Sequence, residues 1–239
     1  MIIIKLGGGL VAPKEWEAEK ADLTVIRRLS DELVQGVDPG KKMVVVSGSG
    51  NYGHKAVERY GISEARGIAR VRESARKIGE IVRDELEKAG RDAELIIPHE
   101  IFPGGRLSIA EDKTPVLYGD VIEVEKGKWK VWSGEKIIRK LTERLRDVEM
   151  IVQVSREEGV WDRQGLIIPE INKSNWEVIK QDVGGAEGSD VTGGMLHKVE
   201  ESLEIARDCG VKTWIISGAV PGRLKDLLQG KRVPGTRVG

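Results

Sequence analysis

The chain of 239 residues has little of what marks several classes of protein. Cys209 is its only cysteine, so no disulfide can form within the chain, and a small buried side chain is the simplest interpretation. Lys plus Arg and Asp plus Glu number 39 each, and a net charge of zero gives no electrostatic reason to bind nucleic acid or a membrane surface. No apolar run approaches the length of a membrane span, and MIIIKLGGG lacks the pattern of a signal peptide. We therefore expect a soluble protein of the cytoplasm.

Apolar runs alternate with helical patterns along the chain. The runs predict strands at 2–6, 43–47, 94–98, 150–155 and 212–217, with a final edge strand at 236–238. Apolar residues at helical spacing predict helices at about 16–35, 63–89, 135–146, 195–208 and 221–228. This alternation predicts one α/β domain over residues 1–239, a three-layer α/β/α sandwich with a mostly parallel central sheet.

Short β-like pieces interrupt the alternation in the middle of the chain. They are expected at 106–109, 115–118, 121–124 and 129–132. The sequence Glu-Lys-Gly-Lys at 125–128 is typical of a hairpin turn between the last two pieces. We expect these pieces to form β-hairpin insertions on the parallel sheet.

The segment VVVSGSGNYGH at 44–54 is the most informative part of the sequence. A predicted buried strand is followed by a loop with glycines at 48, 50 and 53, and the loop ends at His54. Such a loop brings backbone N–H groups close to a phosphate, and the next helix start adds its positive dipole end. The chain has only three histidines, so His54 is a candidate for chemistry. The alternative is a tight connection without a ligand, which is common in α/β proteins.

Two further glycine-rich segments, 7–9 and 193–194, adjoin predicted core elements, and each lies near a lysine. Lys5 is in the first strand, where the alternative is an edge lysine with its ammonium group in water. Lys198 follows the second segment, where the alternative is an ordinary surface lysine. Phosphoryl transfer needs positive charge on the moving group and little covalent chemistry, so two lysines and backbone N–H groups would suffice.

Taken in order along the chain, these segments resemble the amino-acid kinase superfamily, and most of all its isopentenyl phosphate kinase branch. The matching residues are Lys5-Leu6-Gly7-Gly8 with Lys14, the Gly48–His54 loop, 115–120, Ser133-Gly134-Glu135, 190–195 with Lys198, Pro221-Gly222 and Gly235-Thr236. The loop of glycines followed by His54 separates this branch from uridylate and acetylglutamate kinases. The resemblance covers nearly the whole chain.

The resemblance implies transfer of the γ-phosphate of ATP, with Mg²⁺, to a small phosphomonoester, isopentenyl phosphate first of all. Lys5 and Lys198 would neutralise charge on the moving group, Glu135 would organise these lysines, and Lys14 would support ATP. The expected nucleotide-binding residues are Lys5, Gly7, Gly8, Gly9, Gly50, Ser155, Gly193, Gly194 and Lys198. The expected acceptor-binding residues are Ser49, Gly53, His54 and Gly134.

The resemblance also implies a homodimer, an acceptor half at about 1–145 and a nucleotide half at about 146–239. The helix at 63–89 and its neighbours would line the pocket for the prenyl tail. No dedicated protein cage for a metal is visible in the sequence.

The chain departs from the family pattern at three places along the sequence. Gly9 replaces a serine, Glu135 replaces an aspartate, and Ser155-Arg156 replaces Thr-Asp. Two alternatives therefore stay open beside the first interpretation. One is a kinase of the same fold for another phosphomonoester, and the other is a catalytically weakened homologue that only binds a small molecule.

Overall fold

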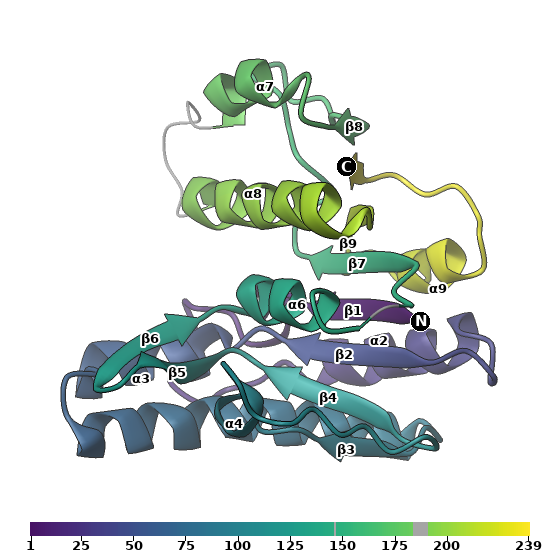
Figure 1. The fold of residues 1–239 in the computed structure, drawn as a ribbon. Coiled ribbons are helices and arrows are strands. Elements are labelled where there is room, and N and C mark those ends of the chain that lie inside the picture. Colours follow the sequence, from purple (N-terminus) through teal and green to yellow (C-terminus); the bar gives the residue numbers. More distant parts are fainter. Residues whose placement is uncertain (146, 184–190) are drawn as a thin grey trace.

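The computed structural model of the protein describes residues 1–145, 147–183 and 191–239. Its centre is an eight-stranded sheet (Figure 1). The strands, in spatial order, are β3 (Ala93–Leu95), β4 (Thr114–Tyr118), β2 (Met43–Ser47), β1 (Ile2–Leu6), β7 (Met150–Ser155), β9 (Thr213–Ser217), β10 (Thr236–Val238) and β8 (Glu170–Ile171). All neighbours pair in parallel except β9 and β10, which confirms the predicted mostly parallel sheet.

Helices cover both faces of the sheet, which confirms the three-layer α/β/α architecture (Figure 1). The helices are α1 (Gly8–Val11), α2 (Leu23–Gly36), α3 (Gly50–Tyr60), α4 (Ala65–Lys88), α5 (Pro98–Ile101), α6 (Gly134–Thr142), α7 (Trp176–Val183), α8 (Val191–Cys209) and α9 (Arg223–Leu228). None of them, in the described part of the chain, combines the length and apolarity that a membrane span needs.

The two cores on either side of β1 explain where its side chains point. Ile2, Ile4 and Leu6 pack with residues of α2 and α4. Ile3 packs with residues of α6 and α8 on the other face. Because side chains alternate along a strand, Lys5 shares the face of Ile3 and lies beneath α6 and α8.

The predicted hairpin is present as a separate two-stranded sheet of β5 (Asp120–Glu125) and β6 (Lys128–Trp132). Gly127 has a φ of 76°, a turn conformation that glycine adopts without strain. The hairpin extends beyond the main sheet beside α3 and α4 (Figure 1), and Val121 joins a small core with residues of those helices.

Several predicted boundaries were wrong. The helix expected at 16–35 begins only at Leu23, because the Asp22 side chain accepts a hydrogen bond from Val25 N and caps it. The strand expected at 94–98 ends at Leu95, and Pro98 opens α5. No strand forms at 106–109, and the helix expected to 146 ends at Thr142.

Other differences concern whole elements. The glycines at 50 and 53, expected in a loop, lie in α3. Gly193 and Gly194, also expected in a loop, lie in the first turn of α8. Residue 190 of the 190–195 motif falls outside the described residues, as do residues 184–189 before it. No pattern in the sequence indicated α7 or β8. Because β8 pairs with β10, the last strand is not an edge strand as expected.

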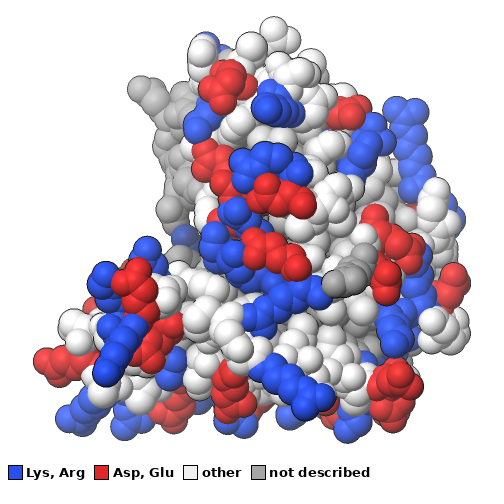
Figure 2. All heavy atoms as spheres, in the orientation of Figure 1, with Lys and Arg blue, Asp and Glu red and all other residues white. Residues whose placement is uncertain are grey.

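The visible face of the molecule carries interspersed acidic and basic side chains (Figure 2). This mixture agrees with the balanced composition and leaves no large field of one sign on this face.

Candidate active site

Two glycine-rich turns touch where β1 and β2 end. These strands pair in register to Leu6 and Ser47, so the segments that follow them leave the sheet side by side. A Cβ atom on Gly8 would lie 2.5 Å from the Gly50 nitrogen, and one on Gly48 would lie 2.3 Å from the Gly8 nitrogen. Only glycine permits so close an approach of the two backbones. In the first turn of α3 the N–H of Asn51 donates to Ala12 O, and those of Tyr52 and Gly53 donate to Ser49 O. The junction therefore offers an anion mainly the positive dipole end of α3.

Three ionised side chains converge beneath this junction. Glu135 Oε1 accepts a hydrogen bond of 2.6 Å from Lys5 Nζ and lies 3.6 Å from Lys198 Nζ. Lys5 is only 4% exposed, Glu135 8% and Lys198 9%. The alternatives of an edge lysine at 5 and an ordinary surface lysine at 198 are therefore wrong. Lys5 is a buried residue of a central strand, and Lys198 is buried as well.

Burial and mutual charge set the protonation of this cluster. Burial lowers the pKa of Lys198, the neighbouring Lys5 ammonium lowers it further, Glu135 opposes both, and the result is about 8. Burial by itself would raise the pKa of Glu135, but Lys5 and Lys198 outweigh it and hold that pKa well below its usual range. Glu135 therefore stays ionised at neutral pH, and it serves as a counter-ion rather than as a base.

The start of α6 brings the expected acceptor residues together. Ser133 caps the helix by accepting a hydrogen bond from Lys136 N. A Cβ atom on Gly134 would lie 2.6 Å from Lys5 Cε. One on Gly119 would lie 3.5 Å from Gly134 N and 3.6 Å from Ser49 Oγ. The α6 terminus, the β4–β5 turn and the glycine loop therefore meet at one point beside Lys5.

The other two expected acceptor residues lie in the first turns of α3. A Cβ atom on Gly53 would lie 2.3 Å from Ser49 Oγ, so Gly53 packs directly on Ser49. His54 is exposed on the next position of the helix. This arrangement leaves the imidazole at the solvent side of the junction, one residue beyond the packed backbone.

The expected nucleotide residues are more dispersed. Gly7 donates its N–H to Val154 O at 2.8 Å, and Ser155 follows at the end of β7. Among the described residues, none lies within 4 Å of a Cβ built on Gly9 or on Gly194. The structure therefore places Gly7 and Ser155 side by side and leaves open space at Gly9 and Gly194.

Lys14 and the departure at Arg156 lie at the same rim. Lys14 is exposed in the segment between α1 and α2. The next residue, Glu15, forms a 2.7 Å ion pair with Arg156, and both side chains are more than half exposed. The arginine that replaces the family's acid thus contacts the segment that carries Lys14.

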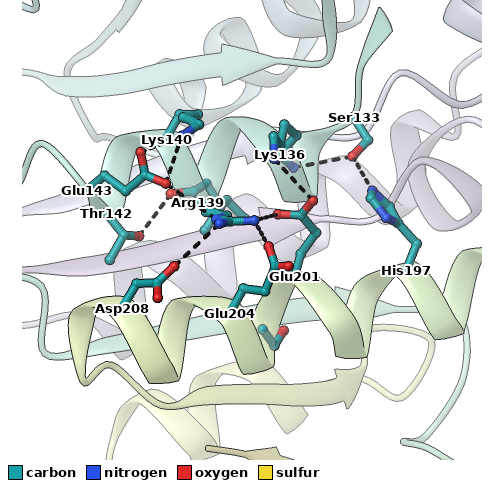
Figure 3. Close-up of polar contacts among 12 residues, drawn as sticks. Ser133, Lys136, Arg139, Lys140, Thr142, Glu143, His197, Glu201, Glu204 and Asp208 are labelled. Carbon is teal, nitrogen blue, oxygen red and sulfur yellow. Dashed lines mark hydrogen bonds and ion pairs between the residues drawn. The ribbon is translucent and has the colours of Figure 1, made fainter. Parts of the chain in front are cut away.

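Sequence reasoning missed the contacts that join α6 to α8 (Figure 3). Figure 3 shows Arg139 of α6 among Glu201, Glu204 and Asp208 of α8, and the ion pairs include Glu201 at 3.6 Å and Asp208 at 3.3 Å. Ser133 Oγ lies 3.0 Å from Nε2 of His197, the residue before Lys198. These contacts hold together the helices that carry Glu135 and Lys198. Only the position of His197 next to Lys198 could have singled it out.

A second histidine, His99, contacts an aspartate at the carboxyl edge of the sheet. His99 of α5 contacts Asp120 through Nδ1 and Oδ2 at 2.7 Å, and the carboxylate also accepts from the His99 backbone N–H. The Asp120 side chain is fully buried. The pair ties α5 to the turn that contains Gly119.

Residues 1–103 match the model of the Amino acid kinase family. The sequence is 30% identical to the isopentenyl phosphate kinase of Methanothermobacter thermautotrophicus over 266 aligned positions, covering 100% of this chain and 98% of that one. It is 29% identical to the isopentenyl phosphate kinase of Haloferax volcanii, covering 86% of this chain and 88% of that one.

Solved structures show the same similarity. One from a study of X-ray structures of isopentenyl phosphate kinase has a TM-score of 0.79 at 26% identity and covers 99% of both chains. The Thermoplasma acidophilum isopentenyl phosphate kinase, in its product complex, also reaches a TM-score of 0.79, and at 21% identity it shows likeness of fold.

Proposed function

Because this chain belongs to the amino acid kinase family, we propose that it phosphorylates isopentenyl phosphate with ATP, giving isopentenyl diphosphate and ADP. The observation that carries the phosphoryl transfer is the buried Lys5–Glu135–Lys198 cluster beneath two touching glycine turns. The relatives named isopentenyl phosphate kinase support the choice of acceptor.

The cluster has the charge that this reaction needs. Two ammonium groups share one carboxylate, so it presents a net charge of about +1 to an incoming phosphoryl group. In the reaction an oxygen of the acceptor phosphate bonds to the γ-phosphorus, and the bond from that phosphorus to the β–γ bridging oxygen breaks. ADP leaves with the bonding electron pair. Charge on the three equatorial oxygens is what the lysines would stabilise in the transition state.

A phosphate acceptor also explains why no base is required. A phosphate dianion carries no proton that must be removed before attack, unlike an alcohol. Glu135 is held ionised and paired with two lysines, so it is unsuited to take up a proton. The chemistry of the cluster therefore favours a phosphate over a hydroxyl as nucleophile.

We place the acceptor phosphate at Ser49, Gly53, His54 and Gly134. Ser49 offers a hydroxyl and Gly134 the N–H of a helix start, both of which donate to phosphate oxygens. An imidazole N–H of His54 would donate to the same dianion from the solvent side. Acceptor binding then falls to residues of about 1–145, and nucleotide binding extends into 146–239 through Ser155, Gly193 and Gly194.

Magnesium would arrive with ATP. The described residues contain no group of three acidic, histidine or cysteine side chains arranged to hold a metal, and Glu135 is already paired. Magnesium commonly keeps water and substrate phosphates as ligands, so the nucleotide would supply them. Lys14 would neutralise further charge on the nucleotide phosphates.

The protein would act in the cytoplasm, where ATP is supplied, and it would do so as a homodimer. Light scattering on the pure protein would test the dimer.

The direct test is to incubate the pure protein with ATP, Mg²⁺ and a panel of phosphomonoesters led by isopentenyl phosphate, and to measure ADP release. We expect ADP only with isopentenyl phosphate, and diphosphate product by mass spectrometry. ADP with a different acceptor would retain the mechanism and change the substrate. ATP binding by calorimetry without turnover on any acceptor would contradict the proposal and favour a binding protein.

A further inference from the structure

Gln153 is a buried polar residue beside the lysine cluster that the proposed reaction does not use. It lies in β7, is 1% exposed, and shares the face of the sheet that α8 covers. In the register of the parallel strands its neighbours are Lys5 on β1 and Ile215 on β9. Of these two neighbours, only Lys5 carries a polar group.

A short chain of hydrogen bonds runs from Gln153 to the backbone of Lys198. Gln153 Nε2 donates to Ser202 Oγ at 3.0 Å, and Ser202 Oγ donates to the Lys198 carbonyl oxygen at 2.7 Å. All three residues are buried. The chain therefore fixes the turn of α8 that carries Lys198 to the strand next to Lys5.

The same hydrogen bonds fix the orientation of the Gln153 amide. The single proton of the Ser202 hydroxyl is used on the Lys198 carbonyl, so its oxygen can only accept from Gln153. The amide must present Nε2 to Ser202, and Oε1 points elsewhere. Oε1 is buried and has no hydrogen-bond partner in the described structure. A buried orphan acceptor is unfavourable and marks a place where a donor is expected.

The lysine cluster has donors to spare. Two ammonium groups carry six N–H bonds in all, and the one carboxylate between them accepts the 2.6 Å bond from Lys5. A phosphoryl group bound above the cluster would attract both ammonium groups and draw them away from Glu135. A neutral acceptor beside them can then hold an ammonium N–H without cancelling any of the positive charge that the phosphoryl group needs.

We propose that Gln153 is a positioning residue of the phosphoryl-transfer site: its Nε2 holds α8 through Ser202, and its Oε1 accepts a hydrogen bond from the lysine ammonium groups as they engage the phosphoryl group. This role rests on the proposed kinase function. It makes Gln153 act through Lys5 and Lys198, without contact to the substrate.

Three variants separate the two parts of this role. Ser202→Ala breaks the tie to α8 but keeps the amide. Gln153→Leu removes both the tie and the acceptor at similar volume. Gln153→Glu puts a negative charge at the orphan oxygen with almost no change in shape, and it also loses the donor to Ser202. We expect Gln153→Leu to lower kcat about tenfold more than Ser202→Ala does, with the KM for the acceptor within a few-fold, because positioning errors act mainly on the transition state.

The lysine pKa values give a readout that does not depend on turnover. Lysine ¹⁵N NMR titration of the free protein, assigned with Lys198→Arg, should find the Lys198 pKa near 8 in the wild type. The charged groups that face this ammonium are Lys5 from β1 and Glu135 from α6. We expect Gln153→Glu to raise that pKa, because its carboxylate would lie beside the ammonium groups. Gln153→Leu and Ser202→Ala should leave it unchanged, because Gln153 Oε1 has no partner in the described structure of the free protein.

Equal kcat values for Gln153→Leu and Ser202→Ala, or a Lys198 pKa that is the same in every variant, would overturn the proposal and leave Gln153 as a packing residue. If Gln153→Glu does not fold, the kcat values of Gln153→Leu and Ser202→Ala still test the positioning role of Gln153. Failure of the wild type to release ADP would refute the kinase function, whereas the titration would still test Gln153.

Discussion

The junction of the two glycine turns and the rim around Arg156 differ in how much of their geometry is fixed. At the junction, Gly8 and Gly48 leave no room for a methyl group, and the lysine cluster beneath is almost fully buried. At the rim, the Arg156–Glu15 pair is more than half exposed and Gly9 has open space around it. The comparison teaches that the departures from the family pattern do not cost alike: Gly9 and Arg156 lie at the tolerant rim, whereas Glu135 lies in the packed centre.

The largest effect is expected from Lys198→Ala, which removes one of the two ammonium groups at the junction. Loss of a preorganised charge that stabilises the transition state lowers kcat by about 10²- to 10³-fold. ATP affinity should stay within a few-fold, since Lys5 and the backbone N–H groups remain. Steady-state kinetics and calorimetry measure the two quantities. An unchanged kcat would remove Lys198 from the site.

Gly48→Ala tests whether activity requires the close approach of the two glycine turns at the junction. The added Cβ would lie 2.3 Å from the Gly8 nitrogen, so the two turns must separate, and we expect activity to fall about 10²-fold. Gly9→Ala is the matched control, because its Cβ meets nothing within 4 Å. Assays of both variants at matched thermal stability make the comparison. Similar activities would show that the close approach is not required.

His54→Ala probes a residue that is exposed but attached to the junction. We expect the KM for the acceptor to rise about tenfold, because one hydrogen bond to a charged phosphate is lost. The KM for ATP should change less than twofold. A variant at the other exposed histidine, His197→Ala, is a useful comparison because that ring contacts Ser133 instead. Equal changes in both KM values for His54→Ala would disprove its assignment to the acceptor.

The smallest effect is expected at the rim. Arg156→Asp restores the residue type of the family and breaks the exposed pair with Glu15. Exposed ion pairs contribute about 0 to 1 kcal/mol, so thermal stability should barely change and activity should remain within a few-fold. Thermal unfolding and steady-state kinetics check this. A complete loss of activity would show that Arg156 has acquired a role through the segment that carries Lys14.

Much of the fold was predictable because buried parallel strands consist of nearly continuous apolar residues. The runs at 2–6, 43–47 and 150–155 match β1, β2 and β7 residue for residue. Helix starts were harder to predict. Gly50 and Gly53 indicated a loop, yet α3 begins at Gly50. A φ of 48° and a Cβ position only 2.0 Å from Ala12 O require glycine there, whatever its helix propensity.

The lysine cluster was predictable only through the order of several motifs, since Lys5, Glu135 and Lys198 are far apart in the sequence. No motif pointed to Gln153 and Ser202. They are 49 residues apart, and a hydrogen bond between a strand and a helix leaves no periodic signal in a sequence. The sequence alone could not predict which buried polar groups lie next to one another in the folded site.

The unequal count of ammonium and carboxylate groups in the buried cluster has a consequence for turnover. With two lysines to one glutamate, the empty site attracts anions of any kind, so inorganic phosphate and pyrophosphate should compete with the substrates. A diphosphate carries more negative charge than the monophosphate from which it is made. The site should therefore hold its diphosphate product more firmly than its monophosphate substrate, which would appear as inhibition by the product.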